Sequence, residues 1–445
     1  MSCSSQQMFS NANNLGIHGG QFSNVQGDMH VHSAAAERHG LKLLLQNISP
    51  GALHDAAERD DQPGCHENTR VAIRKEIMDW LQKPGAREKF VLWLYGPVGS
   101  GKTSIAQSIA EALAELGLLA ASFFFRRSAA GRNTSDRFIA TIAYQLSCYF
   151  PVMADLLYTA IEKDPIIFSK LRATQLQLLI VHPLKAALQY ASPLTTPKPI
   201  VIIVDGVDEC LPAKSQVELL GLLQTIVGEF QSIPFLCFVS SRPEYEIRST
   251  FAGSNLFGAL TTKIALKNNN QTFQDIKFFL LTEFSRIRDE NLQIGTELPS
   301  PWPANHDVDN IAEKASGQFI FASTVMKFVS SSEDDPVERL NIIMGLYSLG
   351  PGQRPFDPLD DLYRTILASI SPNSLPKVLD ILSLIISAPE LQLSPSVWLA
   401  GGLLELDIRK TLIRMHALVH VPPPKDKYPM YLYHKSFEDF VERYT

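Results

Sequence analysis

The sequence predicts an α/β protein whose parallel sheet is covered by helices on both faces. Four apolar runs have the length and composition of strands buried on both faces, at residues 90–95, 119–125 (apolar apart from Ser122), 200–204 and 235–239. Amphipathic stretches separate these runs, as expected where helices connect parallel strands. After about Asn268 the strand-like runs stop, and the chain continues as helices with one late strand. The order of elements therefore predicts a sheet domain followed by a mainly helical part.

Residues 1–48 form a low-complexity segment. Up to about Gly40 the segment is rich in Ser, Asn, Gln, Gly and His, which is typical of a disordered tail. Residues 17–25 alternate single apolar residues with polar residues and glycines, so self-assembly through pairing of identical segments is the second interpretation. Both interpretations stay open. A linker rich in Asp, Pro, Gly and Ala follows at residues 49–67.

Residues 68–265 are expected to form the sheet domain. A helix should open this domain, with Asn68 or Thr69 as its N-cap and Trp80 on its apolar side. The other helices are expected between the strands, at residues 103–116, 136–150 and 215–230.

The remainder of the chain is predicted to be mostly helical. Residues 266–350 should form a helical domain, with helices at 272–287, 308–315, 319–329 and 337–347. A Gly- and Pro-rich break at 350–355 separates it from residues 351–445. This last part is expected to hold a core helix near 378–389, a strand at 430–433 and a helix at 436–444.

Composition narrows the function classes. The chain has 445 residues, too many for one core, and its net charge of −6 with scattered Lys and Arg disfavours a nucleic-acid partner. The five cysteines form no CxxC pair, so we expect neither a disulfide framework nor a zinc site, and we expect Cys148 and Cys237 to be buried. The start of the chain lacks the apolar region of a signal peptide, and no stretch is long enough to span a membrane. A cytoplasmic location is the default expectation.

The strongest motif follows the first predicted strand. The pattern GxxxxGK[ST] is complete in the segment Gly96, Pro97, Val98, Gly99, Ser100, Gly101, Lys102 and Thr103, and Ser104 comes next. Glycines let backbone N–H groups wrap around phosphates, and the following helix adds a partial positive charge. Lys102 can reach the β- and γ-phosphates, and Thr103 can ligate Mg²⁺. The motif predicts a P-loop that binds a nucleoside triphosphate.

A second motif places carboxylates after the buried strand at residues 200–204. Asp205 should reach the carboxyl edge of the sheet and hold Mg²⁺, partly through water. Asp208 and Glu209 follow on the loop, where either can orient or deprotonate the attacking water. The alternative is a solvated acidic turn.

A third motif ends the strand at residues 235–239. Arg242 follows it and can sense the γ-phosphate, because a guanidinium matches phosphate geometry. A surface arginine before Pro243 is the equally open alternative.

These motifs together resemble the NACHT branch of the STAND family of signalling P-loop NTPases. The DGxDE form of residues 205–209, the SSRPE of 240–244 and the FFFRR of 123–127 carry the resemblance. The stretches GGQFSNVQGD, CHENTR, IMDWL, SGQFIFAST and HKSFEDF are similar to fungal NACHT proteins with a nephrocystin-like N-terminal type of domain. Similarity thus extends over nearly the whole chain.

The resemblance implies a NACHT nucleotide-binding domain, a helical domain and a winged-helix domain, in that order. It implies a switch that retains ADP when inactive, exchanges it for ATP, hydrolyses slowly and forms a homo-oligomer when active, in signalling of an innate-immunity or incompatibility kind. His434 matches a winged-helix histidine that touches the β-phosphate, and Arg70 matches a residue that approaches the adenine. The open alternatives are a packing histidine at a strand end and a surface arginine at a helix start.

Two departures qualify these expectations. Gly317 is followed by Gln318 and Phe319 where related proteins carry a proline that contacts the base. No sensor repeat array is visible within the 445 residues, so another chain senses, the N-terminal segment assembles, or the sequence is truncated. The downstream partner is unknown. A housekeeping P-loop NTPase with continuous turnover is the alternative function, and a degenerate scaffold is disfavoured because Lys102, Thr103 and Asp205 are all present.

Overall fold

The computed structural model describes most of the chain after residue 38. The described residues are 39–59, 64–189, 199–252, 256–330, 335–345, 357–368, 370–388, 409–412, 415, 417–422 and 429–444. The two interpretations of residues 17–25 fall outside these ranges and stay predictions.

A five-stranded parallel sheet organises the first part of the molecule, in the order β2-β3-β4-β1-β5. The strands are β1 (Val91–Tyr95), β2 (Leu119–Phe124), β3 (Ile200–Asp205), β4 (Phe235–Ser241) and β5 (Thr261–Ala265). The four strands predicted from apolar runs are confirmed. The fifth, β5, was not predicted, because its sequence TTKIA mixes polar and apolar residues, as suits a strand at the edge of a sheet.

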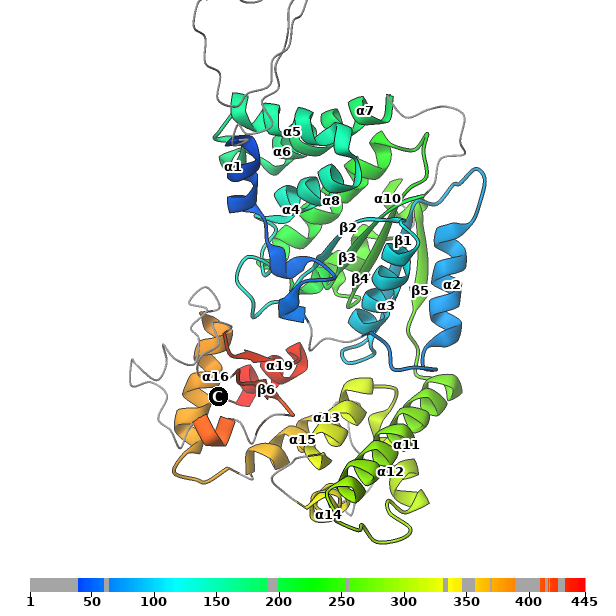
Figure 1. Cartoon of the computed structure of the whole chain (residues 1–445), viewed down its shortest axis with the longest axis vertical. Helices are drawn as coiled ribbons and strands as arrows, with labels where there is room; N and C mark the ends of the chain where they lie inside the picture. Colours follow the sequence, from blue (N-terminus) through cyan, green and yellow to red (C-terminus); the bar gives the residue numbers. More distant parts are fainter. Residues whose placement is uncertain are drawn as a thin grey trace, which may run out of the picture.

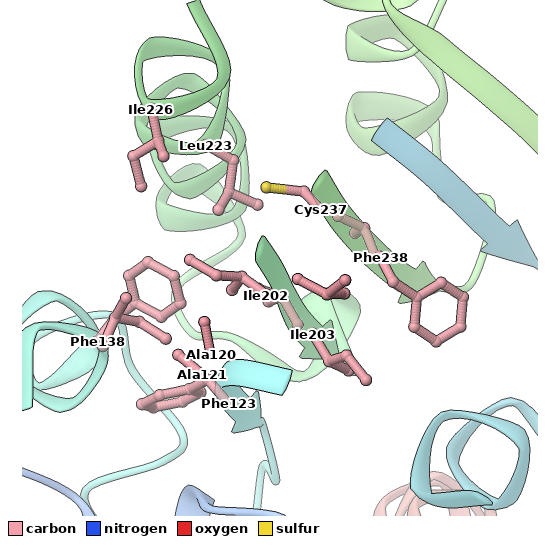
Figure 2. Close-up of a cluster of buried hydrophobic side chains, with 14 of the residues drawn as sticks. Ala120, Ala121, Phe123, Phe138, Ile202, Ile203, Leu223, Ile226, Cys237 and Phe238 are labelled. Atoms are coloured by element: carbon pink, nitrogen blue, oxygen red, sulfur yellow. The ribbon is translucent and has the colours of Figure 1, made fainter. Parts of the chain in front are cut away.

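Helices cover both faces of the sheet, as predicted (Figure 1). One face is covered by α3 (Lys102–Glu115), and α2 (Val71–Gln82) packs beside α3, where Trp80 donates to Thr262 of the edge strand β5. The other face is covered by α4 (Phe138–Tyr149) and α8 (Ala213–Glu229). Figure 2 shows how Phe138 and Leu223 from these two helices lie near Ile202 of strand β3.

Further helices surround this three-layer core. A layer beyond α4 consists of α1 (His39–Asn47), α5 (Pro151–Lys163), α6 (Arg172–Leu176) and α7 (His182–Gln189), with a π-helical turn at Gln177–Val181 between α6 and α7. Two short helices lie between β4 and β5, α9 (Tyr245–Thr250) and α10 (Leu256–Ala259). Short 3-10 turns occupy Pro50–Ala52, Ala57–Arg59, Ile167–Ser169 and Val207–Glu209.

Three details differ from the predictions. The N-cap of α2 is Arg70, which has a left-handed φ of 54°, rather than Asn68 or Thr69. The Thr69 hydroxyl instead donates to the carbonyl of His66. Cys148 is exposed on α4, whereas Cys237 is buried in β4 as predicted. The end of the segment predicted to be of low complexity forms the helix α1, and Leu44 of this helix packs into the main core.

A second hydrophobic core follows the sheet part. Its first helices are α11 (Asn270–Gln293), α12 (Asn305–Ala315), α13 (Phe319–Val329) and α14 (Pro336–Gly345). It continues through α15 (Asp357–Ala368), α16 (Leu375–Ser387), the antiparallel pair β6 (Val419–His420) and β7 (Tyr431–Leu432), and α19 (Lys435–Tyr444). The four helices predicted for 266–350, the core helix near 378–389 and the late strand and helix are confirmed.

The second core is continuous across the predicted domain boundary at residue 350. Buried side chains from Ile276 on α11 to Val441 on α19 belong to one cluster, in which the Tyr363 ring lies 5.0 Å from that of Phe437. The predicted domain limits and the winged-helix assignment stay predictions, since residues 389–408 lie outside the described part. No described helix combines the length and the apolar character needed to cross a bilayer.

Candidate functional site

The P-loop joins β1 to α3 and is shaped by glycines. Gly99 and Gly101 have φ values of 71° and 87°, in the left-handed region that favours glycine. Gly101 is also the N-cap of α3. A side chain at Gly99 would meet Ile320 at the start of α13, because an added Cβ would lie 2.2 Å from the Ile320 Cγ2. The loop therefore has the glycine backbone geometry expected of a P-loop, and it touches the second core.

Lys102 is folded back over its own loop. Its ammonium group donates to the carbonyl oxygens of Gly96 at 3.0 Å and of Pro97 at 2.9 Å. Burial lowers the pKa of Lys102, which shows that its charge is poorly solvated here. A poorly solvated ammonium group at a helix N-terminus attracts an anion such as a phosphate.

Thr103 and Asp205 meet at the carboxyl end of β3, as the sequence predicted. The Asp205 carboxyl accepts hydrogen bonds from the hydroxyls of Ser240 and Thr103, and burial raises its pKa. A threonine hydroxyl beside a carboxylate supplies the oxygen ligands that Mg²⁺ prefers. The two residues fit the predicted metal role.

Asp208 and Glu209 lie on the turn after β3 in different surroundings. Burial acts to raise the pKa of Asp208, but Lys435, Lys102 and Arg242 hold it below its usual value. Lys435 Nζ lies 3.5 Å from its carboxylate and donates to its carbonyl oxygen at 3.1 Å. By contrast, burial raises the pKa of Glu209 to about 7, helped by the negative charge of Asp208. Glu209 therefore exchanges a proton near neutrality, while Asp208 is held ionised.

Arg242 extends from the end of β4 towards the same edge. Its backbone N–H donates to Asp208 Oδ1 at 3.0 Å, and its Nε lies 3.3 Å from Asp208 Oδ2. Its Nη1 donates to Asp439 Oδ2 at 2.9 Å, on α19 of the second core. Arg242 thus connects the two cores through ion pairs and is not an isolated surface arginine.

Arg70 ties the P-loop to α11. Its backbone N–H donates to Asp275, and its guanidinium donates to Thr272 Oγ1 at 2.9 Å and to the Ser100 carbonyl at 3.0 Å. The guanidinium carbon lies 4.8 Å from the centre of the Phe319 ring on α13. These contacts give Arg70 a positioning role, and its predicted approach to a base stays a prediction.

His434 follows β7 and faces the P-loop side. Its Nδ1 accepts the backbone N–H of Ser436 at 3.0 Å and lies 2.6 Å from the Ser436 hydroxyl. Burial lowers the pKa of His434 to about 3, and the cations Arg242, Lys102 and Arg126 contribute. The imidazole is therefore neutral, and because Nδ1 is an acceptor its proton resides on Nε2.

Most of these groups line one cavity of about 640 Å³. This volume is within the usual range for small-molecule sites. The P-loop and the turn after β3 form one side, α11 and α13 form another, and residues 433–435 with Glu438 close the third. Gly96 and Pro97 do not line it, and their carbonyl oxygens accept from the Lys102 ammonium. Every other predicted site residue does line it: Arg70, Val98, Gly99, Ser100, Gly101, Lys102, Thr103, Ser104, Asp205, Asp208, Glu209, Arg242 and His434.

Several lining residues were not predicted from sequence. Lys435 and Glu438 are buried on α19, and Arg126 donates to the carbonyl of Leu432 in β7. The FFFRR and HKSFEDF stretches contain these residues, but nothing in either stretch indicates that the two meet. His66 and Phe279, whose rings lie 5.4 Å apart, also border the cavity.

Comparisons with known proteins agree with this site. Residues 70–242 match the family described as nephrocystin 3, N-terminal, which confirms the predicted resemblance over that segment. No curated protein sequence matches the chain. The five-stranded parallel sheet, its P-loop and the carboxylate at the end of β3 are those of a P-loop NTPase.

Solved structures resemble the chain at low identity. A Walker-type ATPase of Pyrococcus abyssi is 12% identical, with 85% of this chain and 98% of that chain covered and a TM-score of 0.40. The Drosophila ORC bound to DNA is 12% identical, with 83% and 93% covered and a TM-score of 0.35.

Proposed function

We propose that this chain is a nucleotide-operated signalling switch of the NACHT and STAND type. ATP and ADP bind at the P-loop, and slow hydrolysis resets the switch. Nucleotide exchange changes how the two cores are held together, and the opened form associates with further copies of itself. One observation carries the proposal: His434 lines the same cavity as Lys102, although 332 residues separate them in the sequence.

The diphosphate favours the closed arrangement through His434. A neutral imidazole with its proton on Nε2 can donate a hydrogen bond into the cavity, while Nδ1 is fixed by Ser436. If Nε2 donates to a β-phosphate held by the P-loop, the ligand links the two cores. A ligand that contacts both cores stabilises only the arrangement in which they touch.

Residues at the sheet edge would hold Mg²⁺ and activate water. Thr103 and Asp205 would bind the metal ion, which neutralises charge on the phosphates when present. Glu209 can accept a proton from water near pH 7, since its pKa is raised to about 7. Asp208 is paired with Lys435 and Arg242, so we assign it to positioning and Glu209 to proton transfer.

Retention of nucleotide tests the proposal most simply. Protein purified without added nucleotide should release ADP on denaturation, identified by mass spectrometry, and should turn over added ATP far more slowly than it binds it. Empty protein with sustained multiple turnover would instead favour the housekeeping NTPase. The identity of the released nucleotide also establishes whether the base is adenine.

A further inference from the structure

The buried lysine Lys435 brings a positive charge from the second core to the edge of the sheet. It is the first residue of α19, is only 7% exposed, and lines the cavity. Its ammonium group donates to the Asp208 carbonyl oxygen at 3.1 Å and lies 3.5 Å from Asp208 Oδ2. Because an ammonium group is costly to bury without partners, these contacts account for the position of the side chain. Through this one residue, α19 reaches the turn that carries the proposed catalytic groups.

The turn that Lys435 contacts has two acidic residues next to each other. Asp208 and Glu209 belong to the same 3-10 turn, Val207–Glu209. Asp208 has a second cation, since the Arg242 Nε lies 3.3 Å from its Oδ2. Glu209 Oε2 accepts from a neutral donor, the Arg127 backbone N–H, at 3.2 Å. Neighbouring carboxylates disfavour each other's ionised form, so the charge of Glu209 depends on nearby cations.

Charged groups from several elements act on Glu209. They are Asp208 on the same turn, Lys102 on α3, Arg132 on the loop after β2, Arg242 after β4, and Lys435 and Glu438 on α19. Burial raises the pKa of Glu209 to about 7, and the positive charge of Lys435 is the largest influence that opposes this rise. Against burial, Lys435 is also foremost among the cations that hold the pKa of Asp208 below its usual value. The cation with the strongest effect on both carboxyl groups therefore comes from the second core.

We propose that Lys435 is a positioning residue for ATP hydrolysis, so that the second core completes the hydrolytic centre. Lys435 holds the turn through the Asp208 carbonyl and favours the ionised form of Glu209. The water oxygen bonds to the terminal phosphorus, the bond from that phosphorus to the leaving ADP breaks, and Glu209 takes the water proton. The inference rests on the proposed function and adds that its hydrolytic step belongs to the arrangement in which α19 is docked.

Removing this charge should change the pH dependence of hydrolysis. Lys435→Met keeps a side chain of similar length but raises the pKa of Glu209. The fall of kcat/KM towards acid pH should therefore begin about one pH unit or more higher than in wild type, with the rate at pH 7 about five-fold lower. Lys435→Arg keeps the charge and should restore the wild-type profile. The measurement is ATP hydrolysis by the full chain with Mg²⁺ across the pH range.

Arg443→Met is the matched control, because it removes a positive charge from the same helix. The Arg443 side chain is 61% exposed and pairs with Asp360 of the second core at 3.0 Å, and among the described residues it does not line the cavity. Its pH profile should coincide with that of wild type.

A double mutant checks the direction of the effect. The negative charge of Asp208 raises the pKa of Glu209, whereas Lys435 lowers it. Adding Asp208→Asn to Lys435→Met should therefore bring the acid side of the profile back towards wild type. The double mutant also leaves no unpaired charge in place of the ion pair.

An unchanged acid side in folded Lys435→Met, or an equal change in Arg443→Met, would overturn the inference. If Lys435→Met does not fold, Asp208→Asn and the double mutant decide the question: the acid side should lie at lower pH in Asp208→Asn, and equal profiles would overturn the inference. Failure of the proposed function appears differently, as wild-type protein that is purified without ADP and turns over ATP continuously.

Discussion

Lys102 is the residue on which the proposed phosphate site depends most directly. It makes hydrogen bonds to two carbonyl groups of its own loop and is held in a place where its charge is poorly solvated. A bound phosphate would offer the ammonium group a charged partner in place of neutral ones. Hydrogen bonds to charged groups are the stronger kind.

Lys102→Ala should weaken triphosphate binding sharply while the protein stays folded. The lost contact is a charge-assisted one, worth roughly 1.5–3 kcal/mol, which corresponds to about ten- to a hundred-fold in Kd. A fluorescent-nucleotide titration measures this loss. Lys75→Ala, at an exposed lysine paired with Asp79 on α2, is the control and should bind like wild type. Comparable affinity in the folded Lys102→Ala variant would contradict the assignment.

Glu209 should set the pH dependence of hydrolysis. It accepts a proton from water only when ionised, and burial raises its pKa from 4.5 to about 7. The value of kcat/KM, which reports groups of the free enzyme, should therefore fall as the pH drops below about 7 and level off above it. Glu209→Gln should bind ATP, lose most of its single-turnover rate and lose this pH dependence.

Glu115→Gln is the control for that measurement. Glu115 is exposed at the end of α3, far along the helix from the P-loop, and its loss should alter neither rate nor profile. A Glu209→Gln rate equal to that of wild type would refute the role of Glu209.

At the scale of elements, α13 abuts the P-loop. The Ile320 backbone N–H donates to the Gly99 carbonyl at 3.3 Å, and a Cβ at Gly99 would collide with the Ile320 side chain. Gly101 has a similar positive φ, but a Cβ added there would meet nothing within 4 Å. Substitutions at the two glycines therefore distinguish the cost of backbone strain, common to both, from the cost of a collision with α13, which arises only at Gly99.

Gly99→Ala should lower the Tm more than Gly101→Ala does. Both variants incur the cost of a left-handed alanine, about 1–2 kcal/mol, but only Gly99→Ala also pushes against α13. Adding Ile320→Ala should remove the excess from Gly99→Ala, judged against the Tm of Ile320→Ala alone. Equal Tm losses for the two single glycine variants would show that α13 does not press on the loop.

Elements with a strong local pattern could be predicted from the sequence, and those defined by tertiary contacts could not. The strands β1 to β4 consist mostly of apolar residues, so their prediction needed no knowledge of the fold. By contrast, β5 is recognisable only from its pairing with β1. Helix α1 has only a short apolar stripe, and the partner that this stripe packs against, α5, lies far along the sequence.

The same distinction applies within the site. The P-loop, Asp205 and Arg242 each end or follow a strand, and parallel strands bring such residues to one edge. The pairing of Lys435 with Asp208 joins residues 227 apart in sequence, and no local pattern encodes it.

The predicted N-cap of α2 was wrong for a related reason. Arg70 adopts a left-handed conformation because Asp275, Thr272 and Ser100 hold it, and propensity alone would place Asn68 or Thr69 there.

At the scale of the whole molecule, two cores meet around one cavity. The sheet core supplies the P-loop, and the second core supplies α13 on one side and residues 433–435 on the other. Arg126, Arg127 and Arg242 of the sheet part all contact residues after 430. A nucleotide in this cavity would touch both cores, so its free energy of binding depends on how they are arranged.

His434→Ala tests the central claim most directly. The Tm of wild type and variant is measured with and without saturating ADP, with His420→Ala on β6 as the control histidine. If His434 donates to the β-phosphate, the variant should show a smaller ADP-induced rise in Tm than wild type and should release ADP faster, while the control behaves like wild type. If His434 only packs at the end of β7, the variant loses the same stability with and without ADP. An ADP-induced rise as large as that of wild type would contradict the account.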